Sequence, residues 1–314
     1  MHTAAVSTTE RAPTSGEAAT PSGSARSGIL LIVGSISSVQ FGAAFARQLF
    51  ADVGPAGVVL LRQGIAAIVL LAVARPHLRG RSAAEWRVVL LFGIVLSAMN
   101  LTFYEAVARL PLGMAVTIEL LGPLGLAVAL SRRLQEFLWC GVAVAGVLLL
   151  SDGGGSVNLV GVLFALIAAA GWASYILLMG SLGSRFQGID GLALAMAVAA
   201  VISSPFGLSA GDRFLTPRVA LLGLLVATLS AIVPFSLEVS ARRLVEPGAF
   251  GVLMSLSPAV AALSGFLILH QRLDAQQLAG MAMVAVASAA TVRATRRRGL
   301  AAAMDEPVVA TAPG

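Results

Sequence analysis

The chain has 314 residues, of which 58% are hydrophobic and 11% are charged, and its mean hydropathy is +0.91. Soluble globular domains are about a quarter charged, so this composition excludes an ordinary soluble protein. All 21 basic residues are arginine and the formal net charge is +6, but the chain has no basic face with interleaved aromatic residues. Most arginines adjoin apolar runs, where they meet lipid head groups, so nucleic-acid binding is not expected.

Residues 1–27 are rich in Ser, Thr, Ala, Gly and Pro, a composition that cannot bury a core and predicts a disordered tail. A cleavable signal peptide is not expected, because the first apolar run lacks a small-residue cleavage site and further spans follow it. The single cysteine, Cys140, lies in an apolar run and has no intrachain partner.

Continuous apolar stretches near 20 residues recur along the whole chain, long enough to cross a hydrocarbon core of about 30 Å as helices. They predict ten transmembrane helices, at 28–46, 55–74, 87–107, 112–129, 137–150, 159–179, 189–206, 219–239, 248–269 and 276–292. The fifth and tenth are short.

The arginines set the expected orientation. With a cytoplasmic N-terminus, fifteen of them fall in inside segments and five in outside loops. This positive-inside asymmetry predicts an inner-membrane protein with both termini in the cytoplasm.

An internal repeat relates the two halves of the chain. Residues 98–123 (AMNLTFYEAVARLPLGMAVTIELLGP) align with residues 231–258 (AIVPFSLEVSARRLVEPGAFGVLMSLSP) with one two-residue insertion. Because the repeat unit has five helices, an odd number, the second copy enters the membrane from the opposite side. We therefore expect an all-α membrane protein with a tail at 1–27, five-helix repeats at 28–150 and 157–292, and a cytoplasmic C-terminal tail at 293–314.

Four ionisable residues fall within the spans: Arg62, Glu119, Glu105 and Glu238. Arg62 and Glu119 each lie about seven residues into helices entered from outside, at a shared depth of roughly 10 Å. One hypothesis is that Arg62 binds a substrate carboxylate while Glu119 binds an ammonium group or the coupling proton. The alternative is a structural Arg62–Glu119 ion pair. The aligned second-half positions, near Met196 and Met254, are apolar.

Glu105 and Glu238 lie within a turn of the membrane interfaces, so they either reach water or act as gates. Pro123 and Pro258 interrupt the hydrogen-bond ladder of their helices near mid-membrane, which either exposes backbone dipoles to a solute or only kinks the helix. The remaining candidates for lining a cavity are Asn100, Tyr104, Trp172 and Tyr175.

Catalytic signals are weak. The three histidines have no metal-ligand spacing, and the DGGG run at 152–155 lacks the Walker lysine and a preceding strand. No metal or cofactor is expected, and energy for transport should come from an ion or solute gradient.

Residues 157–178 (VNLVGVLFALIAAAGWASYILL) resemble the drug/metabolite transporter superfamily, in its ten-helix EamA branch. PLGMAVTIELLGPL at 111–124 and the run at 230–262 are similar to the threonine and homoserine exporter group of that branch. The resemblance implies export of amino acids or similar metabolites by proton antiport, with Arg62 and Glu119 at family positions. Where that pattern usually has Glu before the ninth-helix proline, this chain has Ser257, a further candidate for substrate binding.

We therefore expect a proton-coupled exporter of a small amino acid that works by alternating access in the lipid bilayer. An exporter of uncharged metabolites or drugs on the same scaffold is the alternative, and a non-transport membrane protein is a third reading. The sequence is compatible with a homodimer as well as with a monomer.

Overall fold

The computed structural model describes residues 23–131, 134–151, 158–241, 244–245 and 247–305, and these residues are helical apart from short turns. The elements, in chain order, are α1 (Gly23–Gln48), α2 (Phe50–Ala74), α3 (Ala83–Arg109), α4 (Leu112–Glu119), α5 (Leu121–Ser131), α6 (Leu134–Ser151), α7 (Leu159–Gly183), α8 (Asp190–Gly207), the 3₁₀ helix η1 (Leu208–Leu215), α9 (Pro217–Ala227), the π-helical η2 (Thr228–Ile232), α10 (Val233–Ala241), α11 (Pro247–Met254), α12 (Ser257–Leu269) and α13 (Ala275–Asp305).

These elements form ten apolar spans, as the sequence predicts. Within the described residues, nine helices have the length and composition to cross a membrane, and the shorter Leu134–Leu150 is the tenth. Four of these spans are built from consecutive elements: α4 with α5, α8 with η1, α9 with η2 and α10, and α11 with α12.

Most helices extend a few residues beyond the sequence-based spans, and at two ends the difference changes a predicted tail. Helix α1 already begins at Gly23, so residues 23–27 are helical rather than part of a disordered tail, and residues 1–22 lie outside the described part of the chain. Helix α13 continues to Asp305, well beyond the apolar run that ends near residue 292. Amphipathic and charged residues can extend a transmembrane helix past the bilayer, because the helix satisfies its own backbone groups there too.

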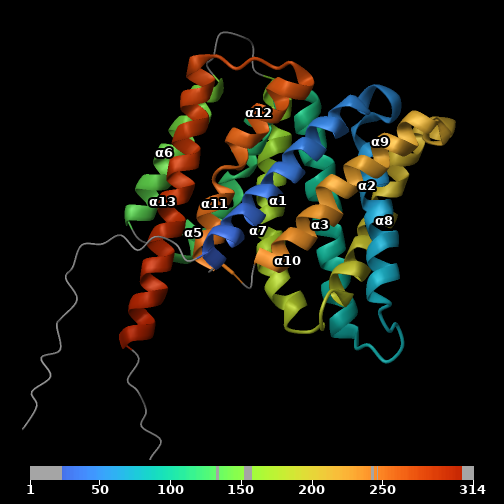
Figure 1. Cartoon of the computed structure of the whole chain (residues 1–314), viewed down its shortest axis with the longest axis horizontal. Helices are drawn as coiled ribbons and strands as arrows, with labels where there is room; N and C mark the ends of the chain where they lie inside the picture. The colour runs from blue at the N-terminus through green and yellow to red at the C-terminus, as the bar shows by residue number, and fades with distance from the viewer. Residues whose placement is uncertain (1–22, 132–133, 152–157, 242–243, 246, 306–314) are drawn as a thin grey trace, which may run out of the picture.

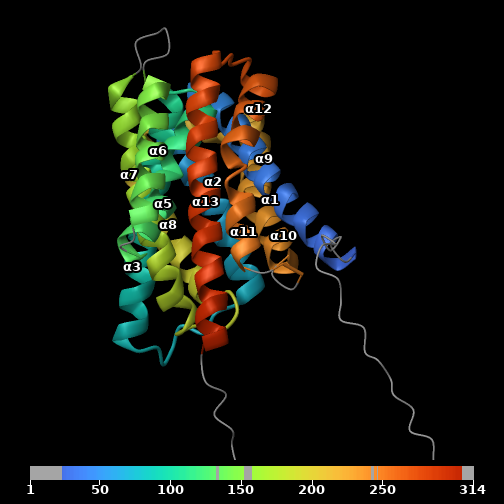
Figure 2. The same cartoon turned by 90° about the vertical axis from the view of Figure 1, so that its left-hand side faces the viewer.

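The two halves run in opposite directions through the bundle. Helix α1 begins at the end where α13 finishes, whereas α7, the first helix of the second half, begins at the opposite end (Figures 1 and 2). The packing follows the same relation, because α1 packs against α10 as α7 packs against α3. The related pairs α2 with α8 and α6 with α13 also pack on each other. The predicted fold class, two inverted five-helix repeats, is confirmed.

The bundle has apolar side chains outside and polar side chains inside. Leu163 and Val201 are 58% and 71% exposed on the outer surface. Inside, the Ser203 hydroxyl donates to Gln63 Oε1 at 2.5 Å and lies 2.9 Å from Ser97 Oγ. These hydrogen bonds join α2, α3 and α8, and they satisfy polar groups that lipid could not.

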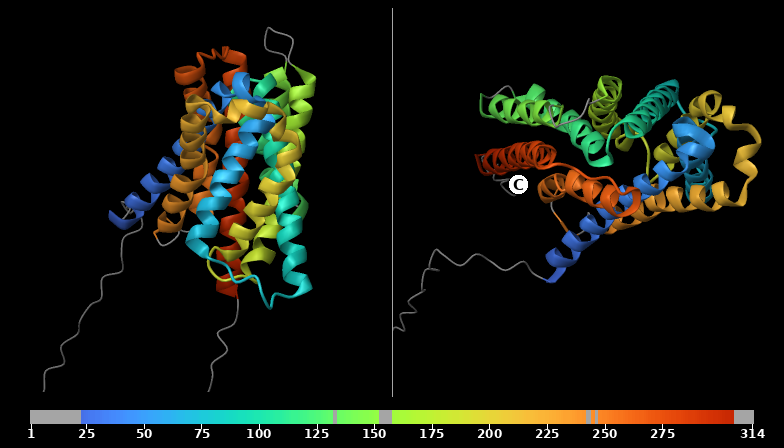
Figure 3. Two further views of the ribbon diagram at one scale, coloured as in Figure 1. Left: turned by 90° about the vertical axis from the view of Figure 1, so that its right-hand side faces the viewer. Right: turned by 90° about the horizontal axis from the view of Figure 1, so that it is seen from above.

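Helices α6 and α13 pack against each other at one side of the bundle (Figure 3). Their backbones come close at two glycines, Gly146 and Gly280. A Cβ atom built on Gly146 would lie 2.7 Å from the carbonyl oxygen of Gly280, and one on Gly280 would lie 2.5 Å from that of Gly146. Small residues of this kind allow transmembrane helices to pack backbone to backbone.

Gly146→Leu is expected to lower the free energy of unfolding by about 1–3 kcal/mol, because the new side chain must push α13 away. Thermal unfolding of the purified protein in detergent measures this change. Gly141→Leu is the matched control on the same helix, since nothing lies within 4 Å of its added Cβ. Equal stability of the two variants would contradict the close packing of α6 on α13.

Candidate functional site

A small cavity lies between the two halves of the bundle. It encloses about 170 Å³, below the roughly 300–1,000 Å³ typical of pockets for drug-sized ligands. Elements α1, α2, α3 and α4 of the first half line it, together with α7, η2, α11 and α12 of the second half. Its lining residues are Val39, Gln40, Ala43, Arg62, Met99, Asn100, Phe103, Tyr104, Val116, Glu119, Trp172, Ser230, Met254 and Ser257. We call it the central cavity.

Arg62 supplies the positive charge of the central cavity. Its Nη1 donates to Asn100 Oδ1, and its guanidinium carbon lies 5.9 Å from the centre of the Tyr104 ring. Asn100 is held in turn, because its Nδ2 donates to the Leu96 carbonyl at 2.7 Å. A guanidinium has five N–H donors in a planar fork, so this arrangement leaves donors to bind a carboxylate.

Glu119 supplies the acidic side chain of the central cavity. It is the last residue of α4, at the point where this span breaks before α5. Among the residues that the structure describes, Arg62 and Glu119 form no ion pair with each other. The structural ion pair that the sequence left open is therefore absent in this conformation, and each charge faces the cavity separately.

Both spans break two or three residues before a proline, which lies in the first turn of the next helix, and both breaks border the central cavity. Pro123 has no N–H group to donate to the carbonyl of Glu119, and Pro258 has none for the carbonyl of Met254. Glu119 and Met254, four residues before each proline, both line the cavity. The pseudo-two-fold relation of the halves therefore brings an acidic and an apolar side chain to equivalent places.

The second-half wall carries two hydroxyl groups. Ser230 in η2 is 9% exposed and Ser257 at the start of α12 is 3% exposed. Within the described part of the chain, neither Oγ atom has a hydrogen-bond partner. A buried polar group without a partner costs about 1–3 kcal/mol, so these hydroxyls are suited to bind a solute.

The structure brings together six of the seven residues that the sequence proposes for substrate binding. These are Arg62, Asn100, Tyr104, Glu119, Trp172 and Ser257. The seventh, Tyr175, does not line the central cavity, because its ring packs on Phe92 with the centroids 5.0 Å apart. Tyr175 lies three residues after Trp172, so its side chain points about 60° away from that of Trp172 around the helix axis. This rotation is enough to turn Tyr175 toward α3.

The two candidate gates lie outside the central cavity. Glu105 forms an ion pair with Arg109, one turn farther along α3. Glu238 accepts a hydrogen bond of 2.9 Å from Ser35 Oγ, which joins α10 to α1. A role for either in gating stays a prediction.

The sequence analysis missed two polar residues of the cavity, Gln40 and Ser230. Its candidates in the spans were ionisable and aromatic side chains, with Asn100 as the one amide and Ser257 as the one serine. A search for Gln and Ser at the depth of Arg62 and Glu119 would have added them as candidates.

Comparison with known proteins gives consistent results. Residues 159–293 match the EamA-like transporter family. The chain is 39% identical over 274 residues to the threonine/homoserine exporter RhtA of Salmonella typhimurium, covering 86% of this chain and 92% of that protein. It is 38% identical over 282 residues to the protein of the same name from Escherichia coli K12, covering 88% and 95%.

A crystal structure with 16% sequence identity also shares the fold. It superposes with a TM-score of 0.57 and covers 87% of this chain and 98% of its own. At this level of identity the likeness concerns the fold alone.

Proposed function

Because the chain belongs to the EamA-like transporter family, in the group of the threonine/homoserine exporters, we propose that it exports small hydroxy amino acids by proton antiport. Membership of this family by itself makes the protein a multi-pass inner-membrane exporter of small metabolites and not an enzyme. The observation that carries the proposed substrate is the central cavity, where an arginine, a carboxyl group and two hydroxyls without partners among the described residues line one small space.

Each part of such a substrate has a complement in the cavity. Arg62 binds the carboxylate and Glu119 binds the ammonium group, at two separate points of the wall. The hydroxyl of the substrate side chain bonds to Ser230 or Ser257, whose Oγ atoms have no partner in the described residues. A site built to bond a hydroxyl rejects an analogue that lacks it, because its own polar groups are then left unpaired.

Proton coupling follows from competition at Glu119. The ionised carboxylate binds the ammonium group of the substrate, and the protonated carboxyl does not. A proton that arrives from outside therefore releases the substrate outward, and the loss of that proton to the cytoplasm prepares the site for the next molecule. Each cycle exchanges one substrate for a proton.

The inverted halves support alternating access. Because each half can adopt the conformation of the other, the cavity between them can open to either side in turn. The breaks at α4–α5 and α11–α12 are suited to move, since their backbone is not held by a continuous hydrogen-bond ladder. We also propose that both termini face the cytoplasm, in accord with the arginine distribution.

The test is efflux of labelled threonine, homoserine and valine from loaded proteoliposomes, with and without a pH gradient. Valine is the control, because it has the shape of threonine without the hydroxyl. We expect threonine or homoserine efflux that the gradient stimulates, and at least ten-fold slower valine efflux. Efflux of uncharged metabolites but of no amino acid would favour the alternative exporter and overturn this proposal.

A further inference from the structure

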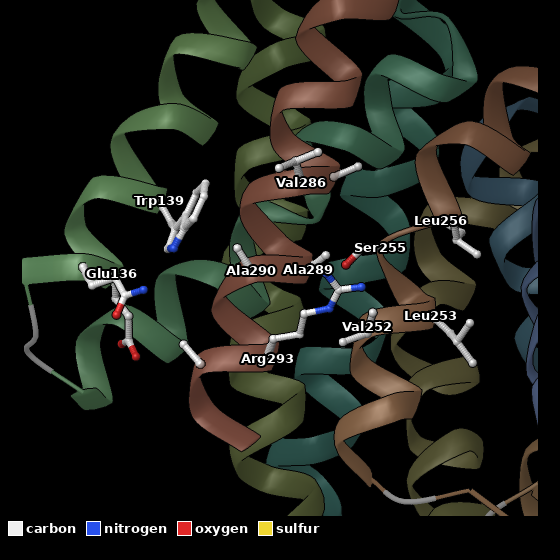
Figure 4. Close-up of a pocket in the computed structure, with 13 residues that line it drawn as sticks. Glu136, Trp139, Val252, Leu253, Ser255, Leu256, Val286, Ala289, Ala290 and Arg293 are labelled. Carbon is white, nitrogen blue, oxygen red and sulfur yellow. The ribbon is translucent and has the colours of Figure 1, made fainter. Parts of the chain in front are cut away.

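A second and larger cavity lies at the side of the bundle, apart from the proposed substrate site. It encloses about 920 Å³ between α6, α11 and α13, and it includes the residues between α11 and α12 (Figure 4). We call it the lateral cavity. It shares no lining residue with the central cavity.

The lateral cavity opens toward the lipid. Two of its lining residues, Leu256 and Val286, are 45% and 57% exposed on the outside of the bundle. Leu256 and Val286 lie within apolar spans, so their exposed side chains contact acyl chains in a membrane.

Its polar and apolar groups are separated along the membrane normal. Glu136 near the start of α6 and Arg293 near the end of the apolar part of α13 lie toward the end of the bundle where α1 begins. Val286 lies seven residues before Arg293 on α13, about 10 Å deeper into the membrane. Apart from Val252 and Leu253, which lie near the level of the charged residues in Figure 4, the apolar lining therefore lies farther inside than the charges, and the cavity is amphipathic.

Ser255 adds a polar group partway along the cavity. It is 4% exposed, and within the described part of the chain its Oγ has no hydrogen-bond partner. Figure 4 shows the Arg293 side chain extending along the cavity to the level of Ser255. An occupant must therefore offer an acceptor at the interface, a polar group below it and an apolar tail.

We propose that a zwitterionic glycerophospholipid of the phosphatidylethanolamine type occupies the lateral cavity, from the leaflet on the side of the chain termini. Its phosphate binds the Arg293 guanidinium, and its ester group accepts a hydrogen bond from Ser255. One acyl chain lies against Val252, Leu256 and Val286. Arg293 supplies a positive charge for the phosphate, whereas the Glu136 carboxylate in the same cavity is 1% exposed, so a head group that adds no net negative charge near Glu136 fits better than a purely anionic one.

Such a lipid would contact the moving part of the proposed transport cycle. Ser255 lies between Met254 and Ser257, which line the central cavity, at the break between α11 and α12. The lipid would hold this break in place from the membrane side while the substrate contacts it from inside.

Native mass spectrometry of the purified chain, titrated with phosphatidylethanolamine and with phosphatidylglycerol, tests the proposal. We expect one tightly retained phosphatidylethanolamine per chain, and about five-fold weaker retention by Arg293→Gln, the effect of one interfacial arginine. Arg87→Gln is the matched control, because Arg87 is exposed near the start of α3 at the same end of the bundle. Ala289→Leu, which fills the cavity without changing its charge, should also lower retention.

Three results would overturn the assignment: equal retention by the wild type and Arg293→Gln, preferential retention of phosphatidylglycerol, or a two-chain species that excludes lipid. The last would mean that a second copy of the chain covers this face. A monodisperse elution profile and an unchanged helical spectrum of each variant exclude misfolding. Because the measurement needs no substrate, it is independent of the proposed amino-acid export.

Discussion

Arg62→Gln is expected to lower threonine or homoserine export about 10- to 150-fold, because hydrogen bonds to charged groups contribute about 1.5–3 kcal/mol and each 1.4 kcal/mol is a factor of ten. Glutamine keeps a polar side chain of similar length but loses the charge and the planar fork that binds a carboxylate. The loss should be larger for amino acids than for their methyl esters, whose carboxylate charge is absent. Initial efflux rates from proteoliposomes measure it.

The control for this prediction is Arg218→Gln. Arg218 has a side chain that is 63% exposed and bonds to Asp52, away from the central cavity, so export should stay near the wild-type rate. If Arg62→Gln folds and exports at the wild-type rate, Arg62 is a structural residue that only supports Asn100.

Glu119→Gln is expected to abolish the stimulation of export by a pH gradient. Glutamine occupies nearly the same volume as glutamate and still accepts a hydrogen bond. Its amide does not take up a proton at the pH of the transport assay, and it carries no charge to pair with an ammonium group. Substrate binding should also weaken about ten-fold, since a charge-assisted hydrogen bond is lost. Efflux at a series of imposed pH gradients, together with substrate binding in detergent, separates the two effects.

Glu105→Gln is the matched control, because Glu105 is also a carboxylate in an apolar span but pairs with Arg109 outside the central cavity. It should keep the response to the gradient. Retention of that response by Glu119→Gln would place the coupling proton elsewhere and remove Glu119 from the mechanism.

Among the described residues, Ser257 leaves the central cavity with one carboxyl group, that of Glu119. In this chain the second break presents Met254 and Ser257 to the cavity, opposite Glu119 in the first half. In the proposed antiport, a single acidic residue would be enough to exchange one proton per substrate, and the neutral hydroxyl side would bind an uncharged part of the solute. The two inverted halves thus have the same backbone break but different chemistry.

The amino-acid sequence alone is enough to predict the ten spans, the inversion of the halves and a common depth for the charged groups. Helices that cross lipid must bury their backbone groups internally, so the length of each apolar run sets a span almost without tertiary information. An odd repeat unit then requires inversion, and counting residues from the interface places Arg62 and Glu119 at one depth.

Which side chains face each other around the helix axes could be learned from the three-dimensional structure but not from the sequence. The structure paired Arg62 with Asn100 rather than with Glu119, placed Trp172 in the central cavity and Tyr175 against Phe92, and added Ser230 from the π-helical turn η2. It also opened the lateral cavity between α6, α11 and α13. Depth follows from position along one helix, whereas the direction of a side chain depends on how that helix rotates against its neighbours, which is set by packing among distant segments.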